Sequence, residues 1–393
     1  MRRSRSGVLA AVLFVVALGA GTYWLTTAPD DDTLQTSVSV ADAMSSDTTG
    51  YQRATTVRDF SFPADHGPHR DFKNEWWYVT GNIDGPSGTP FGYELTIFRF
   101  ALTPPDHNTA VLASAGSDWR TNQFYMAHFA LSNGDAKTFH AFERFGRGGA
   151  GIAGAQAEPF RVWLEDWSMQ SVQEGSTFPI RLQARTPEVG VNLTLRPEKP
   201  MVLQGDRGLS QKGPGQGNAS YYYSYTRLDT KGTLMTSGDT LAVTGESWMD
   251  REWSTSALGP NQVGWDWFSL QLDDGRELMY YQLRNADGSA SRFSDGTLVG
   301  PDGSTESVTA ADVSLEIHDT WTSPDGTHTY PVDWTLRIPS RDIDLRITPY
   351  FPGQELDVSV RYWEGAVRVT GSHSGRGYVE LTGYGDSPAS PTS

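Results

Sequence analysis

Two acidic residues flank an arginine in the segment Asp250-Arg251-Glu252-Trp253. Neighbouring carboxylates can transfer protons to or from a substrate when burial raises the pKa of one of them. The same charges can instead form an ion-pair network that pins two parts of the fold together, and the sequence leaves both interpretations open. The segment follows the last strand expected for the first half of the chain. This places it at a junction between halves, where ligand pockets tend to form.

Glu75 is a second candidate for acid–base chemistry, because it precedes Trp76 and Trp77 in an aromatic strand. If Trp77 belongs to the core, the two-residue period of a strand turns Glu75 toward the same interior. A carboxylate there needs a cationic partner, and Arg99 or Arg251 can supply it. The sequence therefore predicts a general acid or ligand anchor at Glu75, with a buried salt bridge as the alternative.

Other polar and aromatic residues are candidate substrate contacts. Asp266 shares an apolar strand face and is expected to be either functional or salt-bridged, whereas Trp267 on the opposite face packs between domains or stacks on a ligand. His128 is the histidine most expected in the interior, where it serves either the core or a site. The remaining predicted contacts are Trp76, Trp77, Arg99, Tyr223, Tyr225, Arg251 and Trp253.

Metal and cofactor sites are not predicted. The chain has no cysteine, which excludes thiolate ligands, disulfides and cysteine nucleophiles. His66 and His69 can share a metal ion, but no third ligand lies at a useful spacing. The sequence also contains no dinucleotide fingerprint, P-loop, HExxH or GxSxG motif. We therefore expect any chemistry to come from side chains alone.

Short β-strands separated by turns are predicted to position these residues. The 393-residue chain holds 41 glycines and 22 prolines, and no long helical period follows its N-terminal segment. Residues 263–272 and 276–284 flank Asp-Asp-Gly and should form a hairpin. Three segments recur later in the same order, which indicates a duplication. The matching pairs are residues 75–100 with 265–283, 162–183 with 315–337, and 241–248 with 379–384.

The duplication predicts an all-β protein with two tandem β units, at residues 57–254 and 255–385. Each unit is expected to be an antiparallel sandwich or a small barrel, and barrels of this size can hold one small ligand. Closure of the first unit pairs its first strand with its last. This places residues 75–79 beside residues 241–248.

The two ends of the chain carry different signals. Three arginines precede an uncharged run at residues 8–25, which as a helix spans about 27 Å, close to the thickness of a bilayer core. Residues 1–28 are therefore expected to be a cleaved signal peptide or a transmembrane anchor. Polar residues 29–56 are predicted to form a flexible linker, and residues 386–393 a tail.

Export would place the rest of the chain at the periplasmic or extracellular face. It would be anchored to the inner membrane there, or secreted after cleavage. The formal net charge of −16 argues against nucleic acid as a partner.

Several short motifs recur in an order typical of one family. They include Phe62-Pro-Ala-Asp-His-Gly-Pro-His69, Asn74-Glu-Trp-Trp-Tyr-Val-Thr-Gly-Asn82, Tyr222-Tyr-Ser-Tyr-Thr-Arg227 and Ser247-Trp-Met-Asp-Arg-Glu-Trp-Ser254. Across about residues 60–385, the chain resembles the CrtC/AttH-like family, which includes carotenoid 1,2-hydratases and exported AttH-type proteins. The resemblance implies two lipocalin-like domains.

The resemblance also bears on chemistry. Hydratases of this family add water across a terminal isoprenoid double bond by acid–base catalysis without a cofactor, using a histidine close to a tryptophan. In this chain Arg251 stands where that histidine is expected, and arginine does not titrate near neutral pH. That mechanism is therefore not carried over residue by residue. AttH-type relatives imply an accessory role in export.

Two functions follow as hypotheses. In the first, an exported, membrane-proximal protein binds a hydrophobic molecule, such as a lipid or isoprenoid, and serves a transporter of the ABC type. In the second, the protein is a cofactor-free enzyme that hydrates, isomerises or cyclises an isoprenoid or polyene. Tryptophan and tyrosine faces can stabilise a developing carbocation in such a reaction.

Overall fold

The computed structural model describes residues 48–105, 121–236, 238–255, 258–259 and 261–385 of the chain. The predicted targeting segment and the predicted C-terminal tail lie outside the described residues, as does most of the predicted linker. No helix in the described part of the chain is long and apolar enough to cross a membrane.

The first half of the described chain forms one antiparallel sheet. Its strands are β1 (Asn74–Asp84), β2 (Pro90–Ala101), β3 (Gln123–Asn133), β4 (Thr138–Arg147), β5 (Ala153–Gln156), β6 (Arg161–Leu164), β7 (Trp167–Ser171), β8 (Ile180–Arg185), β9 (Gly190–Pro197), β10 (Val202–Leu203), β11 (Leu209–Gln211), β12 (Ala219–Thr236) and β13 (Asp239–Ser254). Their order is β4-β3-β2-β1-β13-β12-β9-β8-β7-β6-β5, and β10 and β11 both pair with β12.

The second half forms another antiparallel sheet. Its strands are β14 (Gln262–Leu272), β15 (Glu277–Asn285), β16 (Asp295–Val299), β17 (Thr305–Thr309), β18 (Ser314–Thr322), β19 (Thr329–Ile338), β20 (Ile343–Pro349), β21 (Glu355–Leu356), β22 (Tyr362–Gly371) and β23 (Gly375–Leu381). Their order is β17-β16-β15-β14-β23-β22-β20-β19-β18, and β21 pairs with β22. Single 3₁₀ turns are described at η1 (Ala64–His66), η2 (Pro86–Gly88) and η3 (Pro339–Arg341).

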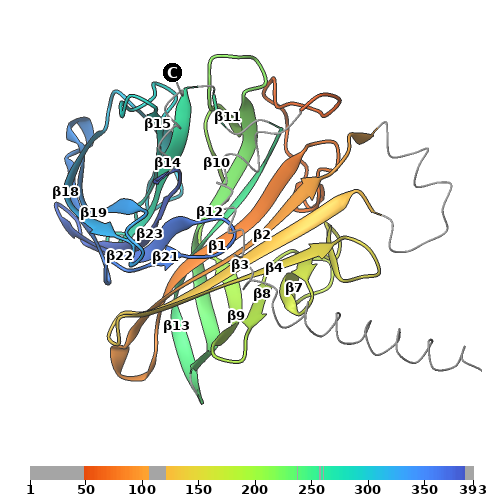
Figure 1. The fold of residues 1–393 in the computed structure, drawn as a ribbon, viewed down its shortest axis with the longest axis horizontal. Coiled ribbons are helices and arrows are strands. Elements are labelled where there is room, and N and C mark those ends of the chain that lie inside the picture. The colour runs from red at the N-terminus through yellow and green to blue at the C-terminus, as the bar shows by residue number, and fades with distance from the viewer. Residues whose placement is uncertain (1–47, 106–120, 237, 256–257, 260, 386–393) are drawn as a thin grey trace, which may run out of the picture. The chain divides into compact units, whose positions relative to one another are not determined.

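Both sheets are curled, as Figure 1 shows, and they confirm the predicted all-β class with two tandem lipocalin-like sheets. In both, the first long strand meets the last. β1 pairs with β13, and β14 pairs with β23. The predicted hairpin is also present as β14 and β15.

The register of β1 against β13 differs from the prediction. Glu75 lies opposite Trp253 and Val79 opposite Met249, so residues 75–79 do not meet residues 241–248. The reason is that β13 is 16 residues long and continues to its end at Ser254. The segment from Asp250 to Trp253 is therefore part of this strand and does not follow it.

Each sheet has its own apolar core on one face. Buried side chains such as Trp77, Leu95 and Phe129 occupy the interior of the first sheet. Phe268 and Trp334 are among those that occupy the interior of the second. The interior space that a small barrel can offer to a ligand is thus taken by side chains.

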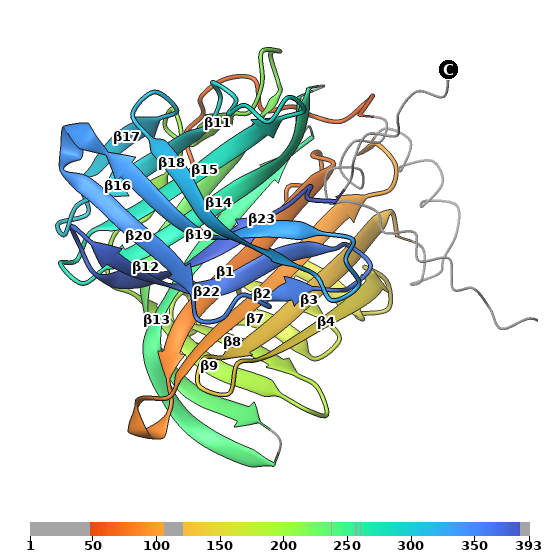
Figure 2. The same ribbon diagram turned by 60° about the vertical axis from the view of Figure 1, so that its left-hand side comes forward.

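The outer faces of the two sheets pack against each other. Because side chains alternate along a strand, Tyr78 on β1 and Trp248 on β13 point away from the first core. They join Trp267 and Tyr378 of the second sheet in one buried cluster. Figure 2 shows β22 and β23 crossing over β1 and β2. A sheet that is apolar on both faces is buried on both.

Residues 51–54, which precede the first strand in the sequence, also pack on this sheet. Ala54 is fully buried, and the Gln52 N–H donates a hydrogen bond to the Asp71 carbonyl at 2.8 Å. The Tyr51 hydroxyl donates to the Ala101 carbonyl at 2.8 Å. The last residues of the predicted linker therefore contact the folded body.

Candidate functional site

A cavity of about 90 Å³ lies between the outer faces of the two sheets. Its lining comes mainly from β1, β2, β12 and β13 on one side and from β14, β15, β22 and β23 on the other. Large aromatic residues dominate the lining, among them Trp76, Tyr78, Phe98, Tyr222, Trp265 and Trp267. Its charged residues are Lys212, Asp250, Glu252, Glu364 and Glu380.

Asp250 is buried in the wall that belongs to the first sheet. Its carboxylate accepts hydrogen bonds from the Tyr222 hydroxyl at 2.5 Å, the Ser224 hydroxyl at 2.5 Å and the Trp248 indole N–H at 2.6 Å. Burial raises the pKa of Asp250 to about 7, although the three hydrogen bonds favour the ionised form. A carboxyl group with such a pKa can gain or lose a proton near neutral pH.

Glu252 lies two residues further along β13 and therefore faces the same cavity. The Lys212 Nζ is 3.5 Å from the Glu252 Oε1 and 3.8 Å from the centre of the Tyr281 ring. Burial opposes the charge of Lys212, but Glu252 and Tyr281 outweigh it and raise the pKa of the ammonium group. This charged pair can orient a polar group of a ligand beside Asp250.

Two carboxyl groups of the second sheet face the same cavity. Glu364 on β22 lies opposite Glu380 on β23, so the two side chains are cross-strand neighbours on one face. The Tyr78 hydroxyl donates to the Glu364 Oε1 at 2.5 Å, and the Trp265 indole N–H donates to the Glu380 Oε1 at 3.1 Å. Burial, together with the charges of neighbouring acids, raises the pKa of both groups. We infer that the pair keeps a proton near neutral pH, because opposed like charges are unfavourable.

Tyr78 connects the two walls. It lies opposite Asp250 in the register of β1 and β13, and its hydroxyl reaches Glu364 on the second sheet. The charges of Asp250 and Glu252 also contribute to the raised pKa of Glu380. The cavity therefore combines a carboxyl group that ionises near neutral pH with a facing pair that holds a proton.

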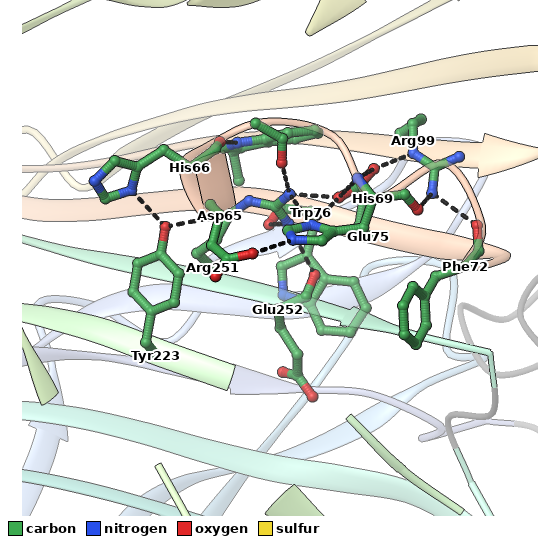
Figure 3. A network of polar contacts seen from close by, with 12 residues as sticks. Asp65, His66, His69, Phe72, Glu75, Trp76, Arg99, Tyr223, Arg251 and Glu252 are labelled. Atoms are coloured by element: carbon green, nitrogen blue, oxygen red, sulfur yellow. Dashed lines mark hydrogen bonds and ion pairs between the residues drawn. The ribbon is translucent and has the colours of Figure 1, made fainter. Parts of the chain in front are cut away.

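Glu75 does not line this cavity, because it shares the inner face of β1 with Trp77. Figure 3 shows Glu75 in a polar network with His69, Arg99 and Arg251. Its fully buried carboxylate forms ion pairs with Arg99 and Arg251, which are also fully buried. The His69 backbone N–H adds a hydrogen bond at 3.0 Å. Burial alone raises the pKa of Glu75, but the two guanidinium groups hold it well below its usual range. This geometry favours the buried salt bridge over the general acid.

Arg251 and Trp253 belong to the same buried network. The Arg251 guanidinium donates to the Gly67 carbonyl at 2.5 Å and lies 3.9 Å from the centre of the Trp77 ring. The His69 ring stacks on Trp253 with centroids 3.7 Å apart. The proposed carboxylate–guanidinium–carboxylate group is thus split between two faces of β13. Its arginine faces inward, because side chains alternate along the strand.

The other predicted contacts lie outside the cavity lining. Asp266 forms an ion pair with Arg284 at 3.0 Å and accepts a hydrogen bond from the Tyr384 hydroxyl at 2.9 Å, as its salt-bridged alternative predicted. The His128 Nδ1 lies 2.7 Å from the hydroxyl of Tyr362, which does line the cavity. His128 therefore does not line the cavity itself but contacts a residue that does. Burial lowers the pKa of His128 to about 3.

Tyr223 and Tyr225 point into the first sheet. The Tyr223 hydroxyl lies 2.6 Å from the His66 Nδ1. Tyr225 packs edge-on against Phe178, with ring centroids 4.6 Å apart. Neither side chain reaches the cavity, since it is the alternate residues Tyr222 and Ser224 that contact Asp250.

The structure thus brings Trp76, Asp250, Glu252 and Trp267 together at the cavity. The sequence prediction missed other residues there, notably Lys212, Tyr222, Glu364 and Glu380. A signal existed for the two glutamates, because each lies two residues after a tyrosine on the same strand face, Tyr362 before Glu364 and Tyr378 before Glu380. Among the described residues, no group of three or more histidines and acids is arranged to hold a metal ion.

The chain is similar to several known proteins. The AttH-like family model matches residues 53–384. The crystal structure of an AttH from Nitrosomonas europaea is 36% identical, covers 85% of this chain and 99% of its own, and superimposes with a TM-score of 0.75. No curated protein matches the sequence significantly.

Two more distant structures share the fold. Kievitone hydratase from Nectria haematococca is 17% identical, with a TM-score of 0.64 over 85% of this chain and 96% of its own. CghA, solved with Sch210972, is 11% identical, with a TM-score of 0.50 over 86% of this chain and 96% of its own. The motifs, the family model and the Nitrosomonas structure agree, and the chain belongs to the AttH-like family.

Proposed function

We propose that this protein is a cofactor-independent acid–base enzyme that hydrates, isomerises or cyclises an apolar alkene of the isoprenoid or polyene class. The observation that carries the proposal is the cavity between the sheets, where Asp250 faces the Glu364–Glu380 pair across an aromatic lining. One distant structural relative is named as a hydratase, which supports the same class of reaction. The enzyme hypothesis thus has more support than binding without conversion.

Hydration can proceed with these residues alone. The Glu364–Glu380 pair gives its proton to one carbon of the double bond, which leaves a carbocation at the other carbon. The faces of Trp76, Trp265 and Trp267 stabilise that cation. Ionised Asp250 takes a proton from water as the new carbon–oxygen bond forms. Solvent then returns a proton to the pair and removes one from Asp250. Isomerisation or cyclisation uses the same two groups, with Asp250 taking the proton from carbon.

The proposal can be tested without knowing the substrate. The full-length protein is purified, the compounds that copurify with it are identified by mass spectrometry, and each is incubated with it in water labelled with heavy oxygen or deuterium. Incorporation of heavy oxygen supports hydration, and incorporation of deuterium without oxygen supports isomerisation or cyclisation. Tight binding of a compound that gains no label and is not converted contradicts the enzyme hypothesis and favours a protein that only binds its ligand.

The pH dependence of turnover should have two limbs. Asp250 must be ionised to act as a base, so the rate should rise as pH increases through about 7, the pKa of this group. The rate should fall at higher pH, where the Glu364–Glu380 pair loses its proton. In Glu380→Gln the alkaline limb should move or vanish while the acidic limb stays, as measured by initial rates in constant ionic strength. A wild-type profile that is flat around pH 7 contradicts the assignment of Asp250.

We also propose that the chain is exported, on the basis of its N-terminal arginines and apolar run. Cell fractionation of the full-length chain, with intact mass measured for the mature protein, distinguishes an anchor from a cleaved signal. Recovery of the whole unprocessed chain in the cytoplasm contradicts export.

A further inference from the structure

A strip of aromatic side chains leads from the cavity to the protein surface. It begins with Trp76 and Phe98, which line the cavity. It continues through Phe100 and Phe124 and ends at Phe145. Successive ring centroids along this path are 6.4, 6.2, 6.4 and 5.9 Å apart. Every neighbouring pair of rings is therefore in contact or nearly so.

The strip follows from the register of four adjacent strands. Trp76 on β1 lies opposite Phe98 on β2, and Phe100 lies opposite Phe124 on β3. All are on the outer face, since the intervening residues of these strands belong to the first core. Adjacent strands are about 4.8 Å apart, so the strip extends roughly 14 Å across the sheet from β1 to Phe145 on β4, and its path is longer because it also runs along β2.

The first four rings of the strip pack against a buried cluster that includes Leu356, Val360 and Tyr362 of the second half, but this packing leaves the strip partly exposed. Its first four rings are only partly buried, and Phe145 is 45% exposed. The outer face of an antiparallel sheet is usually polar where it meets water. A continuous apolar path that stays partly exposed is typical of a binding surface.

The size of the cavity indicates what the strip can hold. A cavity of about 90 Å³ is small beside the 300–1,000 Å³ or so of ordinary ligand pockets. It accommodates the reacting end of a molecule and little else. The remainder of an extended substrate must leave the cavity, and the cavity lining continues without a break into the strip at Trp76 and Phe98.

We propose that the strip from Trp76 to Phe145 binds the linear hydrocarbon chain, acyl or prenyl, of a substrate whose reacting end occupies the cavity. This inference rests on the proposed function for the position of the reacting end. It adds that the substrate is long, and that affinity grows with chain length until the chain reaches Phe145.

The experiment measures how chain length affects binding to the full-length protein. Straight-chain primary alcohols from hexanol to dodecanol displace the fluorescent polyene cis-parinaric acid. Each methylene that becomes buried should lower the Kd about threefold to fourfold. In Phe145→Ser we expect an unchanged Kd for hexanol and a Kd for dodecanol that rises about tenfold, since only the longer chain reaches this ring.

A matched control is Ile317→Ser, which removes another exposed apolar side chain, 51% exposed on β18. It should leave both alcohols unaffected. The inference is overturned if Phe145→Ser changes hexanol and dodecanol equally, if Ile317→Ser has the same effect, or if affinity does not depend on chain length. Its failure differs from that of the proposed function, because the labelled-water assay reads conversion and this assay reads binding alone.

Discussion

Replacement of Asp250 by asparagine should lower turnover about 10²–10⁴-fold, the usual contribution of a positioned acid or base. The amide has the size of the carboxylate but cannot accept a proton from water. Its oxygen can keep the bonds from Ser224 and Trp248, which both reach Oδ1. Its NH₂ can donate to the Tyr222 hydroxyl, which donates to Oδ2 in the wild type. The fold should therefore survive, and the loss should fall on kcat.

Two further variants show whether the loss of turnover in Asp250→Asn comes from the missing base or from a change in the fold. Asp333→Asn removes a carboxylate that pairs with Arg346 at 2.6 Å and does not line the cavity, and it should leave turnover near the wild-type value. Tyr222→Phe removes a hydrogen bond that favours ionised Asp250, so the pKa of Asp250 should rise and the acidic limb of the rate profile should move to higher pH. An Asp250→Asn enzyme that keeps most of its turnover would contradict the role assigned here.

The fold could be predicted because its signals are local or repeated. Alternation and turns indicated strands, and the duplicated segments indicated that β1 and β13 meet. The exact register of β1 against β13 could not be predicted, because no residue in the sequence marks where either strand ends. This mattered for the site. With Glu75 opposite Trp253, Glu75 shares a face with Arg251, and Asp250 lies on the other side.

The acids of the second sheet were missed for a different reason. Glu364 and Glu380 are brought to Asp250 by the packing of one sheet on the other, and no short-range pattern encodes that packing. The aromatic residues of β14 did indicate that the second sheet is covered on its outer face. Trp265 and Trp267 alternate with the apolar residues of the second core, so both faces of this strand are hydrophobic. Such a strand must be covered on both sides.

Replacement of Glu75 by glutamine should destabilise the fold by about 3–5 kcal/mol, because it leaves two buried guanidinium groups without their counter-charge. Arg99 and Arg251 are fully buried, and the glutamine NH₂ group repels one of them. Urea unfolding followed by tryptophan fluorescence measures the loss. Glu316→Gln is the control: this carboxylate pairs with Arg337 while 53% exposed, so its loss should leave the urea midpoint close to that of the wild type.

The pH dependence of the stability difference between wild type and Glu75→Gln gives a second test. The pKa of Glu75 is lowered well below 4.5 by folding, so the native state favours the ionised form more than the unfolded chain does. Its stabilising effect is complete above the unfolded pKa and is lost as pH falls through the lower, folded value. The difference in the free energy of unfolding between wild type and Glu75→Gln should therefore be constant near neutral pH and become smaller below about pH 4.5. A variant that loses turnover but unfolds at the wild-type urea concentration would contradict the structural role of Glu75.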